Sequence, residues 1–194
     1  MHCPACDELE IIEAVYDQEQ SQHLYRRLLH EQNWPDNHYS YAGRQFVLPR
    51  LQTWHADPGI VYSYSNNLLQ TRPWSPLLTG IKTTVEALLN HRFNSVLVNL
   101  YRDGNDYVGW HADNEPELGH QPFIASLTLG AERQFAFRHK QSSISGSVLL
   151  RSGTLLLMHP DFQHHWWHSV PPDTNISQGR INLTFRLVIP LSAS

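Results

Sequence analysis

The stretch Arg180-Ile181-Asn182-Leu183-Thr184-Phe185-Arg186 decides the fold of this chain. Polar and apolar residues alternate along it, which is the period of a β-strand with two unlike faces. One face carries Ile181, Leu183 and Phe185, and the other carries two arginines, an asparagine and a threonine. Such a polar face either points to solvent or lines an interior that holds an anion, because buried guanidinium groups are costly without a partner.

Short strand-like runs surround this stretch throughout the second half of the chain. After Phe93, apolar and β-branched runs recur every few residues, separated by turn signals such as Asp103-Gly104 and Ser152-Gly153. We expect strands over 95–101, 123–129, 134–138, 147–150, 154–158, 164–169 and 181–189. The pattern predicts a mainly β protein with flanking helices and a double-stranded β-helix, or jelly-roll, core.

The first half of the chain contains two helix signals. Asp17 is a helix-capping residue, and it predicts a helix that runs to about Glu31. Apolar residues at spacings of 3 and 4 predict a second helix, from about Ser75 to His91. We expect short strands over 9–15, 46–48 and 61–64, and a loop over 33–40.

Composition and charge set limits on the class of protein. The 194 residues are 41% hydrophobic, which is enough for the core of one domain. The formal net charge is −4, but residues 1–24 hold six acidic and no basic residues, which leaves 14 basic and 12 acidic residues elsewhere. Global charge therefore neither supports nor excludes a nucleic-acid partner. Without a run of 18 apolar residues or a secretory leader, we expect a cytoplasmic monomer that does not contact membranes.

A candidate metal site comes from His111-Ala112-Asp113 and His168. His111 and Asp113 are two residues apart, so a strand would project both side chains from one face. Two histidines and one carboxylate form the facial triad of non-haem iron(II) oxygenases, which leaves open coordination positions. A His-x-Asp tripeptide alone is weak support, since most such sequences are surface turns.

The polar strand face offers a reason for those open positions. A small dicarboxylate bound to iron needs a bidentate arginine at its far end and further donors near the metal. Arg180 to Arg186 would supply them from one strand. Asn99 and Tyr101, also two residues apart, are candidate donors from a second strand, although such a pair taken alone is more often structural.

Several motifs in order resemble the AlkB family of 2-oxoglutarate- and iron(II)-dependent dioxygenases, in particular the subgroup of DNA-repairing animal members. The similarity spans roughly Phe46 to Leu187. The motifs are Asn99-Leu100-Tyr101-Arg102-Asp103-Gly104, Gly109-Trp110-His111-Ala112-Asp113, residues 124–131, Phe135-Ala136-Phe137-Arg138, Trp166-Trp167-His168-Ser169-Val170-Pro171 and residues 180–186.

The resemblance implies roles for the site residues. Fe(II) would be held by His111, Asp113 and His168. The co-substrate 2-oxoglutarate would be bound by Asn99, Tyr101, Arg180, Asn182, Thr184 and Arg186. The implied reaction is oxidative demethylation of N-alkylated bases of the 1-methyladenine and 3-methylcytosine type. It consumes O₂, converts 2-oxoglutarate to succinate and CO₂, and releases formaldehyde.

The resemblance also implies how the base is held. A methylated base in a duplex must be flipped out before an enzyme can reach it. The segment Tyr62-Ser63-Tyr64-Ser65 resembles the one that supplies an aromatic platform, so Tyr64 would stack on the base and His111 would form the opposite wall. Tyr62, Ser65 and Glu115 would complete the base site. The simpler alternative is that both tyrosines are ordinary strand aromatics.

The resemblance divides the single domain, 1–194, into three parts. An N-terminal extension and helix occupy about 1–45, a nucleotide-recognition segment with its supporting helix about 46–92, and the catalytic core about 93–190. Where related duplex-binding proteins insert a bulky apolar wedge, this chain has Ala42 beside Tyr41, which makes single-stranded DNA or RNA a plausible substrate as well as duplex DNA. Candidate contacts to the nucleic-acid backbone are Arg44, Arg50, Arg102, Arg138 and Lys140.

Two alternatives remain at this point. One is a dioxygenase of the same class that acts on a protein or small molecule, and the other is a non-catalytic nucleic-acid-binding barrel. The three metal ligands and the two arginines argue against the second. Cys3 and Cys6 lack the second pair that a zinc site requires, so we expect no zinc there.

Overall fold

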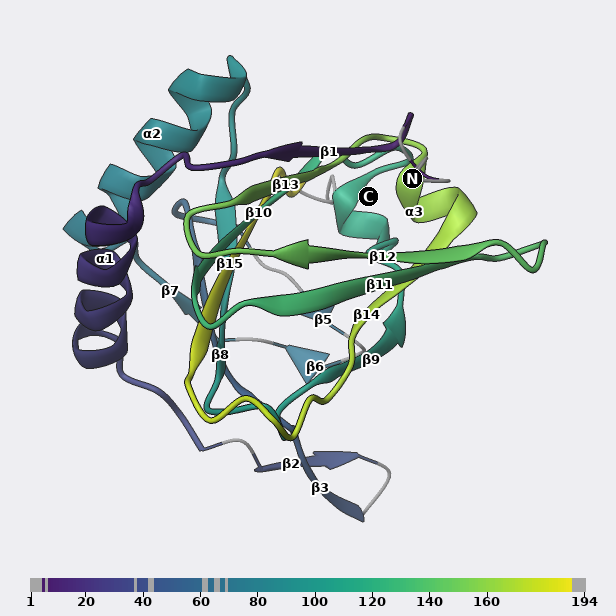
Figure 1. The fold of residues 1–194 in the computed structure, drawn as a ribbon. Coiled ribbons are helices and arrows are strands. Elements are labelled where there is room, and N and C mark those ends of the chain that lie inside the picture. The colour runs from purple at the N-terminus through teal and green to yellow at the C-terminus, as the bar shows by residue number, and fades with distance from the viewer. Residues whose placement is uncertain are drawn as a thin grey trace.

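A computed structural model gives the fold and describes residues 5, 7–36, 38–41, 44–60, 63–64, 67–68 and 70–189. Two β-sheets face each other, and two helices lie on the outside of the larger sheet (Figure 1). Tyr62, Ser65, Cys3, Cys6 and Ala42 fall outside the described residues.

The larger sheet has seven strands, ordered β1-β13-β10-β15-β8-β4-β7. Neighbours run antiparallel except for β4 and β7, which are parallel. The strands are β1 (Leu9–Ile12), β4 (Leu51–Ala56), β7 (Thr71–Arg72), β8 (Ser95–Tyr101), β10 (Ile124–Gly130), β13 (Leu155–Met158) and β15 (Arg180–Arg186).

The smaller sheet has four antiparallel strands, ordered β12-β11-β14-β9. Its strands are β9 (Val108–His111), β11 (Arg133–His139), β12 (Ser145–Leu150) and β14 (Trp166–Val170). Two further hairpins pair β2 (His38–Tyr41) with β3 (Arg44–Val47), and β5 (Ser63–Tyr64) with β6 (Asn67–Leu68).

Two helices bury the outer face of the larger sheet. α1 (Gln18–Glu31) begins at Asp17, whose carboxylate accepts a hydrogen bond from the Gln20 amide, and the Gln20 side chain accepts one from the Asp17 amide. This reciprocal capping box satisfies two amide groups that would otherwise lack partners. α2 (Pro76–Leu89) begins at Ser75, with proline in the first turn. Apolar residues of both helices pack in one buried cluster with outward-facing side chains of the sheet.

The alternation along β15 separates this outer cluster from the interior. Ile181, Leu183 and Phe185 belong to the cluster beneath the helices. Arg180 and Arg186, which point the other way, are also buried, with exposed fractions of 1% and 3%. Their face therefore lies between the two sheets and not in solvent. The predicted jelly-roll core with flanking helices is confirmed.

Several elements differ from the sequence-based expectation. Residues 164 and 165, expected in a strand, end a short helix, α3 (Phe162–His165), and β14 begins only at Trp166. The expected loop over 33–40 already contains the start of β2. β4 was not expected, because its sequence shows no regular polar–apolar alternation. The structure explains why: five of its six residues are buried. A one-turn 3-10 helix, η1 (Pro116–Leu118), follows β9.

Candidate functional site

Two neighbouring strands of the smaller sheet bring together the three predicted metal ligands. His111 ends β9, His168 lies on β14, and the two are direct cross-strand partners. Asp113 follows β9 by two residues. One ligand atom from each side chain lies within 4.8 Å of the others, the only such group of three or more among the described residues. The pairing of β9 with β14, and not closeness in sequence, closes the triad.

Hydrogen bonds fix the orientation of two of these side chains. Nδ1 of His111 donates to the Gly109 carbonyl at 2.8 Å, which leaves the lone pair on Nε2 for a metal. Oδ2 of Asp113 accepts a bond from Arg186 Nη2 at 2.9 Å. The Asp113 amide donates to Oε1 of Gln163, also at 2.9 Å. These hydrogen bonds fix the His111 and Asp113 side chains so that their ligand atoms face the metal position.

The electrostatic setting favours the protonation states that metal binding needs. Burial alone would raise the pKa of the Asp113 carboxyl, but the Arg186 guanidinium and the two imidazoles outweigh it and hold that pKa below its usual range. Burial lowers the pKa of His168 well below its ordinary value, and it also lowers the pKa of His111. Neutral imidazoles and an ionised carboxylate are the ligand forms of these residues.

A second group of donors lies in the same cavity, on β8 and β15. The cavity is about 50 Å³ and is lined by His111, His168, Asn99, Tyr101, Arg180, Asn182 and Arg186 together with mostly apolar residues. Arg180 donates from Nη2 to Oγ1 of Thr128 at 2.9 Å, and its guanidinium carbon lies 5.0 Å from the centre of the Tyr101 ring. Its Nε and Nη1 are buried with no hydrogen-bond partner among the described residues. A buried guanidinium with unmatched N–H groups is suited to binding a carboxylate.

Asn182 and Thr184 form a supporting network. Asn182 donates to Ser126 Oγ at 2.7 Å and to the Leu127 carbonyl at 3.1 Å. Thr184 donates from its hydroxyl to Oδ1 of Asn182 at 2.9 Å. These bonds tie β15 to β10 and fix the amide that lines the cavity.

The expected backbone-contact residues occupy quite different environments. Arg50 is buried: it donates to Oδ1 of Asn99 at 3.0 Å and lines the cavity, so it is not at the surface where a phosphate contact is needed. Arg102 is half exposed and is bound to Asp106. Arg44 and Arg138 are exposed, and Nζ of Lys140 donates to the Gln163 carbonyl at 2.6 Å.

The expected base-binding residues are only partly described. Tyr62 and Ser65 lie outside the described residues, and Tyr64 is placed on β5 without a description of its side chain. Glu115 is half-buried immediately before η1. The His111 side chain is 25% exposed, so the metal site opens to the outside at this residue.

The structure adds residues that sequence reasoning missed. Phe135 stacks on His168, with ring centres 5.2 Å apart, and Gln163 supports Asp113 from α3. Thr128 and Ser126 alternate on β10 in the same way as the polar residues of β15. That alternation was the one available signal. Phe135 lies in one of the motifs that carry the family resemblance, but nothing there gives it a role beside His168, and nothing local in the sequence marks Gln163.

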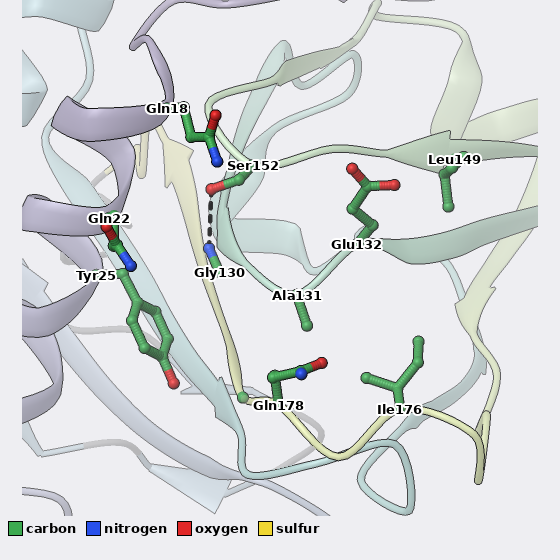
Figure 2. Close-up of a pocket in the computed structure, with 11 residues that line it drawn as sticks. Gln18, Gln22, Tyr25, Gly130, Ala131, Glu132, Leu149, Ser152, Ile176 and Gln178 are labelled. Carbon is green, nitrogen blue, oxygen red and sulfur yellow. Dashed lines mark hydrogen bonds between the residues drawn. The ribbon is translucent and has the colours of Figure 1, made fainter.

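A larger hollow of about 780 Å³ lies on the outer side of the fold (Figure 2). Its walls are α1, the turn after β10, the end of β12 with the turn that follows it, and the segment before β15. Of the described residues that line it, Glu132 alone carries a charge; the rest are apolar, glycine, or neutral polar side chains such as Gln22. The smaller cavity holds the grouped ligands and buried charges, and we therefore assign the candidate site there.

Comparisons with known proteins agree with this assignment of chemistry. Residues 8–186 match the family described as the 2OG-Fe(II) oxygenase superfamily. The chain is similar to mouse "DNA oxidative demethylase ALKBH2", with 38% identity over 156 residues, covering 76% of this chain and 65% of the relative. It is 40% identical over 152 residues to human "Alpha-ketoglutarate-dependent dioxygenase alkB homolog 3", covering 73% of this chain and 52% of the relative. The predicted resemblance to the AlkB family is thus confirmed.

A solved structure supports the fold. The protein described as "The structure of OsALKBH1" superposes with a TM-score of 0.63 at 18% identity, covering 92% of this chain and 97% of that one. The chain spans only between about half and two thirds of the length of the two curated relatives above. Over the described residues, no helix is both long enough and apolar enough to span a bilayer.

Proposed function

The chain belongs to the 2OG-Fe(II) oxygenase superfamily, and from that premise we propose that it oxidatively removes methyl groups from the ring nitrogens of bases in alkylated DNA. One observation carries the proposal: the two histidines of a two-histidine, one-carboxylate group line the same cavity as a buried arginine with unmatched donors. The names of the curated relatives, a DNA oxidative demethylase and an alkB homologue, support the choice of substrate.

The side chains around the cavity are suited to Fe(II) and 2-oxoglutarate, the two groups in the name of the family. Oδ1 of Asp113 is buried 3.7 Å from Nε2 of His111, with no hydrogen-bond partner among the described residues, so a cation would satisfy it. We assign Fe(II) to His111, Asp113 and His168. We assign the far carboxylate of 2-oxoglutarate to Arg180 and Tyr101, and its metal-proximal end to Asn99 and Arg186, with Asn182 and Thr184 as support.

Iron held by these residues would activate O₂, which is the oxidant, while 2-oxoglutarate would be converted to succinate and CO₂. The chain's own residues orient the co-substrate and the metal ligands and enclose the reacting centre. Arg180 fixes the direction of the co-substrate, because its guanidinium is anchored on Thr128. Arg186 keeps Asp113 ionised, and Phe135 restricts the tilt of the His168 ring. The small volume of the cavity, about 50 Å³, limits access of bulk water to the reacting centre.

We propose that the target base enters beside His111, the most exposed of the three ligands. Tyr64 would stack on the base, with Tyr62, Ser65 and Glu115 around its edge. Extracting a base from a duplex costs on the order of a few kcal/mol. Stacking on an aromatic ring returns about 1–3 kcal/mol. An unpaired strand therefore suits this site best, and RNA is a second candidate strand.

The test is incubation with Fe(II), 2-oxoglutarate and oligonucleotides bearing 1-methyladenine or 3-methylcytosine. Single-stranded DNA, duplex DNA and RNA are compared, with formaldehyde and the repaired base measured together. We expect release from the single strand first, and loss of release in His168→Ala. Absence of formaldehyde release from every nucleic acid would overturn the proposal, and release from a methylated peptide in its place would favour a protein substrate.

A further inference from the structure

The outer face of the smaller sheet carries two exposed tryptophans, each beside a cation. Trp110 on β9 is 43% exposed, and Trp167 on β14 is 37% exposed. The guanidinium carbon of Arg138 lies 4.5 Å from the Trp110 ring centre, and Nζ of Lys140 lies 4.7 Å from that of Trp167. We call these four residues the tryptophan face.

The strand register places this face directly behind the metal ligands. Trp110 precedes His111, and Trp167 precedes His168, so the alternation that turns both imidazoles inward turns both indoles outward. Arg138 is the cross-strand partner of Trp167 and also reaches the Trp110 ring. The four side chains thus form one continuous group across β9, β14 and the end of β11.

Acidic residues are absent from the strands that form this face. None of the residues of β9, β11, β12 and β14 is Asp or Glu. The sequence from 133 to 160 contains four basic residues and no acidic one, although the whole chain has a formal net charge of −4. The surface is therefore complementary to a polyanion in a protein that is acidic overall.

We propose that the tryptophan face binds an unpaired stretch of nucleic acid that flanks the target base. Arginine and lysine match phosphate charge, and an exposed indole stacks on a base only when that base is free of its duplex partner. An acidic peptide would match the cations but would leave both indoles unused. The inference rests on the proposed function for its choice of nucleic acid, and it adds a second contact surface, outside the cavity, for the strand that flanks the target base.

Binding is tested without iron or turnover, by fluorescence anisotropy of a labelled, lesion-free single-stranded oligonucleotide. Trp167→Ala and Trp110→Ala should each weaken binding about 5- to 100-fold. The logarithm of the affinity falls as the logarithm of the salt concentration rises, and Arg138→Ala should make this slope shallower by about 0.7. Arg138→Lys should keep the slope of the unaltered protein. The matched control is Arg92→Ala, which removes an exposed cation beyond the end of α2 and should leave both quantities unchanged.

A measurement on the unaltered protein avoids any dependence on how the variants fold. Saturation with the oligonucleotide should protect the two exposed indoles from quenching by acrylamide, and an equal concentration of duplex should protect them less. Unchanged affinity in both tryptophan variants would overturn the proposal. Equal protection by duplex, or protection by poly-glutamate alone, would overturn it as well.

The two proposals fail separately. If formaldehyde is released from methylated oligonucleotides but binding does not depend on the two tryptophans, the proposal for the tryptophan face is refuted and the proposed function stands. Tryptophan-dependent binding without formaldehyde release does the reverse.

Discussion

At the scale of the residue, Asp113 connects the proposed metal position to β15. One of its oxygens accepts a bond from Arg186 on β15, and the other faces His111. Both side chains of the Asp113–Arg186 pair are almost completely buried, at 2% and 3% exposure. In such a setting, removing one partner leaves an uncompensated charge, which is far costlier than losing an exposed ion pair.

Arg186→Gln should therefore destabilise the metal-free protein by about 3–5 kcal/mol. A bound divalent cation offsets part of the charge on Asp113, so the loss should be smaller with metal than without it. Urea unfolding in the presence of EDTA and of Mn(II) measures both values. An equal loss in the two conditions would contradict the shared role of Asp113.

Arg180→Ala should weaken 2-oxoglutarate specifically. Hydrogen bonds to a charged partner contribute about 1.5–3 kcal/mol, which corresponds to roughly a 10- to 100-fold rise in the KM for 2-oxoglutarate. Because the side chain also contacts Thr128 and Tyr101, Arg180→Lys is the comparison, and it should recover part of the affinity. A KM unchanged in both variants would rule out the assignment.

The sequence predicted the grouping of those residues that carry a chemical pattern. His111 with Asp113, and the alternating face of β15, are recognisable because ligand spacing and strand period coincide. Arg50 was predicted as a surface contact to the nucleic-acid backbone, but it is buried. An arginine after a proline gives no sign of burial, and its position follows from a hydrogen bond to Asn99, 49 residues away.

At the scale of the element, helix ends were predicted well because their signals are local. Asp17 acts as the N-cap expected of it, and the second helix begins at Ser75, where it was expected to start. α3 was not predicted, since a single turn of four residues has no hydrophobic period to detect. The bounds of β8 were predicted to the residue, whereas β4 required knowledge of its neighbours β7 and β8.

Asp17→Ala should lower the free energy of unfolding by about 1 kcal/mol, because it removes the carboxylate that accepts a hydrogen bond from the Gln20 amide, although the Asp17 backbone amide can still donate to the Gln20 side chain. Urea denaturation at neutral pH is the measurement. Gln22→Ala is the matched control in the same helix: its side chain is exposed, and the change should stay within about 0.5 kcal/mol. Equal effects of the two substitutions would show that the cap contributes nothing of its own.

At the scale of the whole molecule, buried histidines make stability depend on pH. His55 on β4 is buried, and its ring nitrogens contact the Pro73 carbonyl at 2.8 Å and Oε1 of Gln32, at the end of α1, at 3.1 Å. Burial lowers the pKa of His55 below its ordinary value. The unfolded chain therefore binds this proton more readily than the folded one, and protonation favours unfolding.

The stabilisation from neutral His55 is fully present above about pH 6.5 and is lost as the pH falls below that value. The slope is at most about 1.4 kcal/mol per pH unit for one proton. We expect urea unfolding of the metal-free protein between pH 7 and pH 5 to show a steeper dependence than that of His55→Gln. Parallel profiles would exclude His55 as a source of this dependence.

The pairing of β9 and β14 has a consequence for local opening. β9 is the last strand of the smaller sheet, and its ladder with β14 is irregular between His168 and Val170. Edge strands are among the first parts of a sheet to exchange amide hydrogens with solvent. An ion held by His111 and His168 clamps two adjacent strands across that edge. Protection of the β9 amides from hydrogen exchange then reports metal occupancy. Trp110 lies on the same strand, so its side chain should become less mobile when the metal is bound.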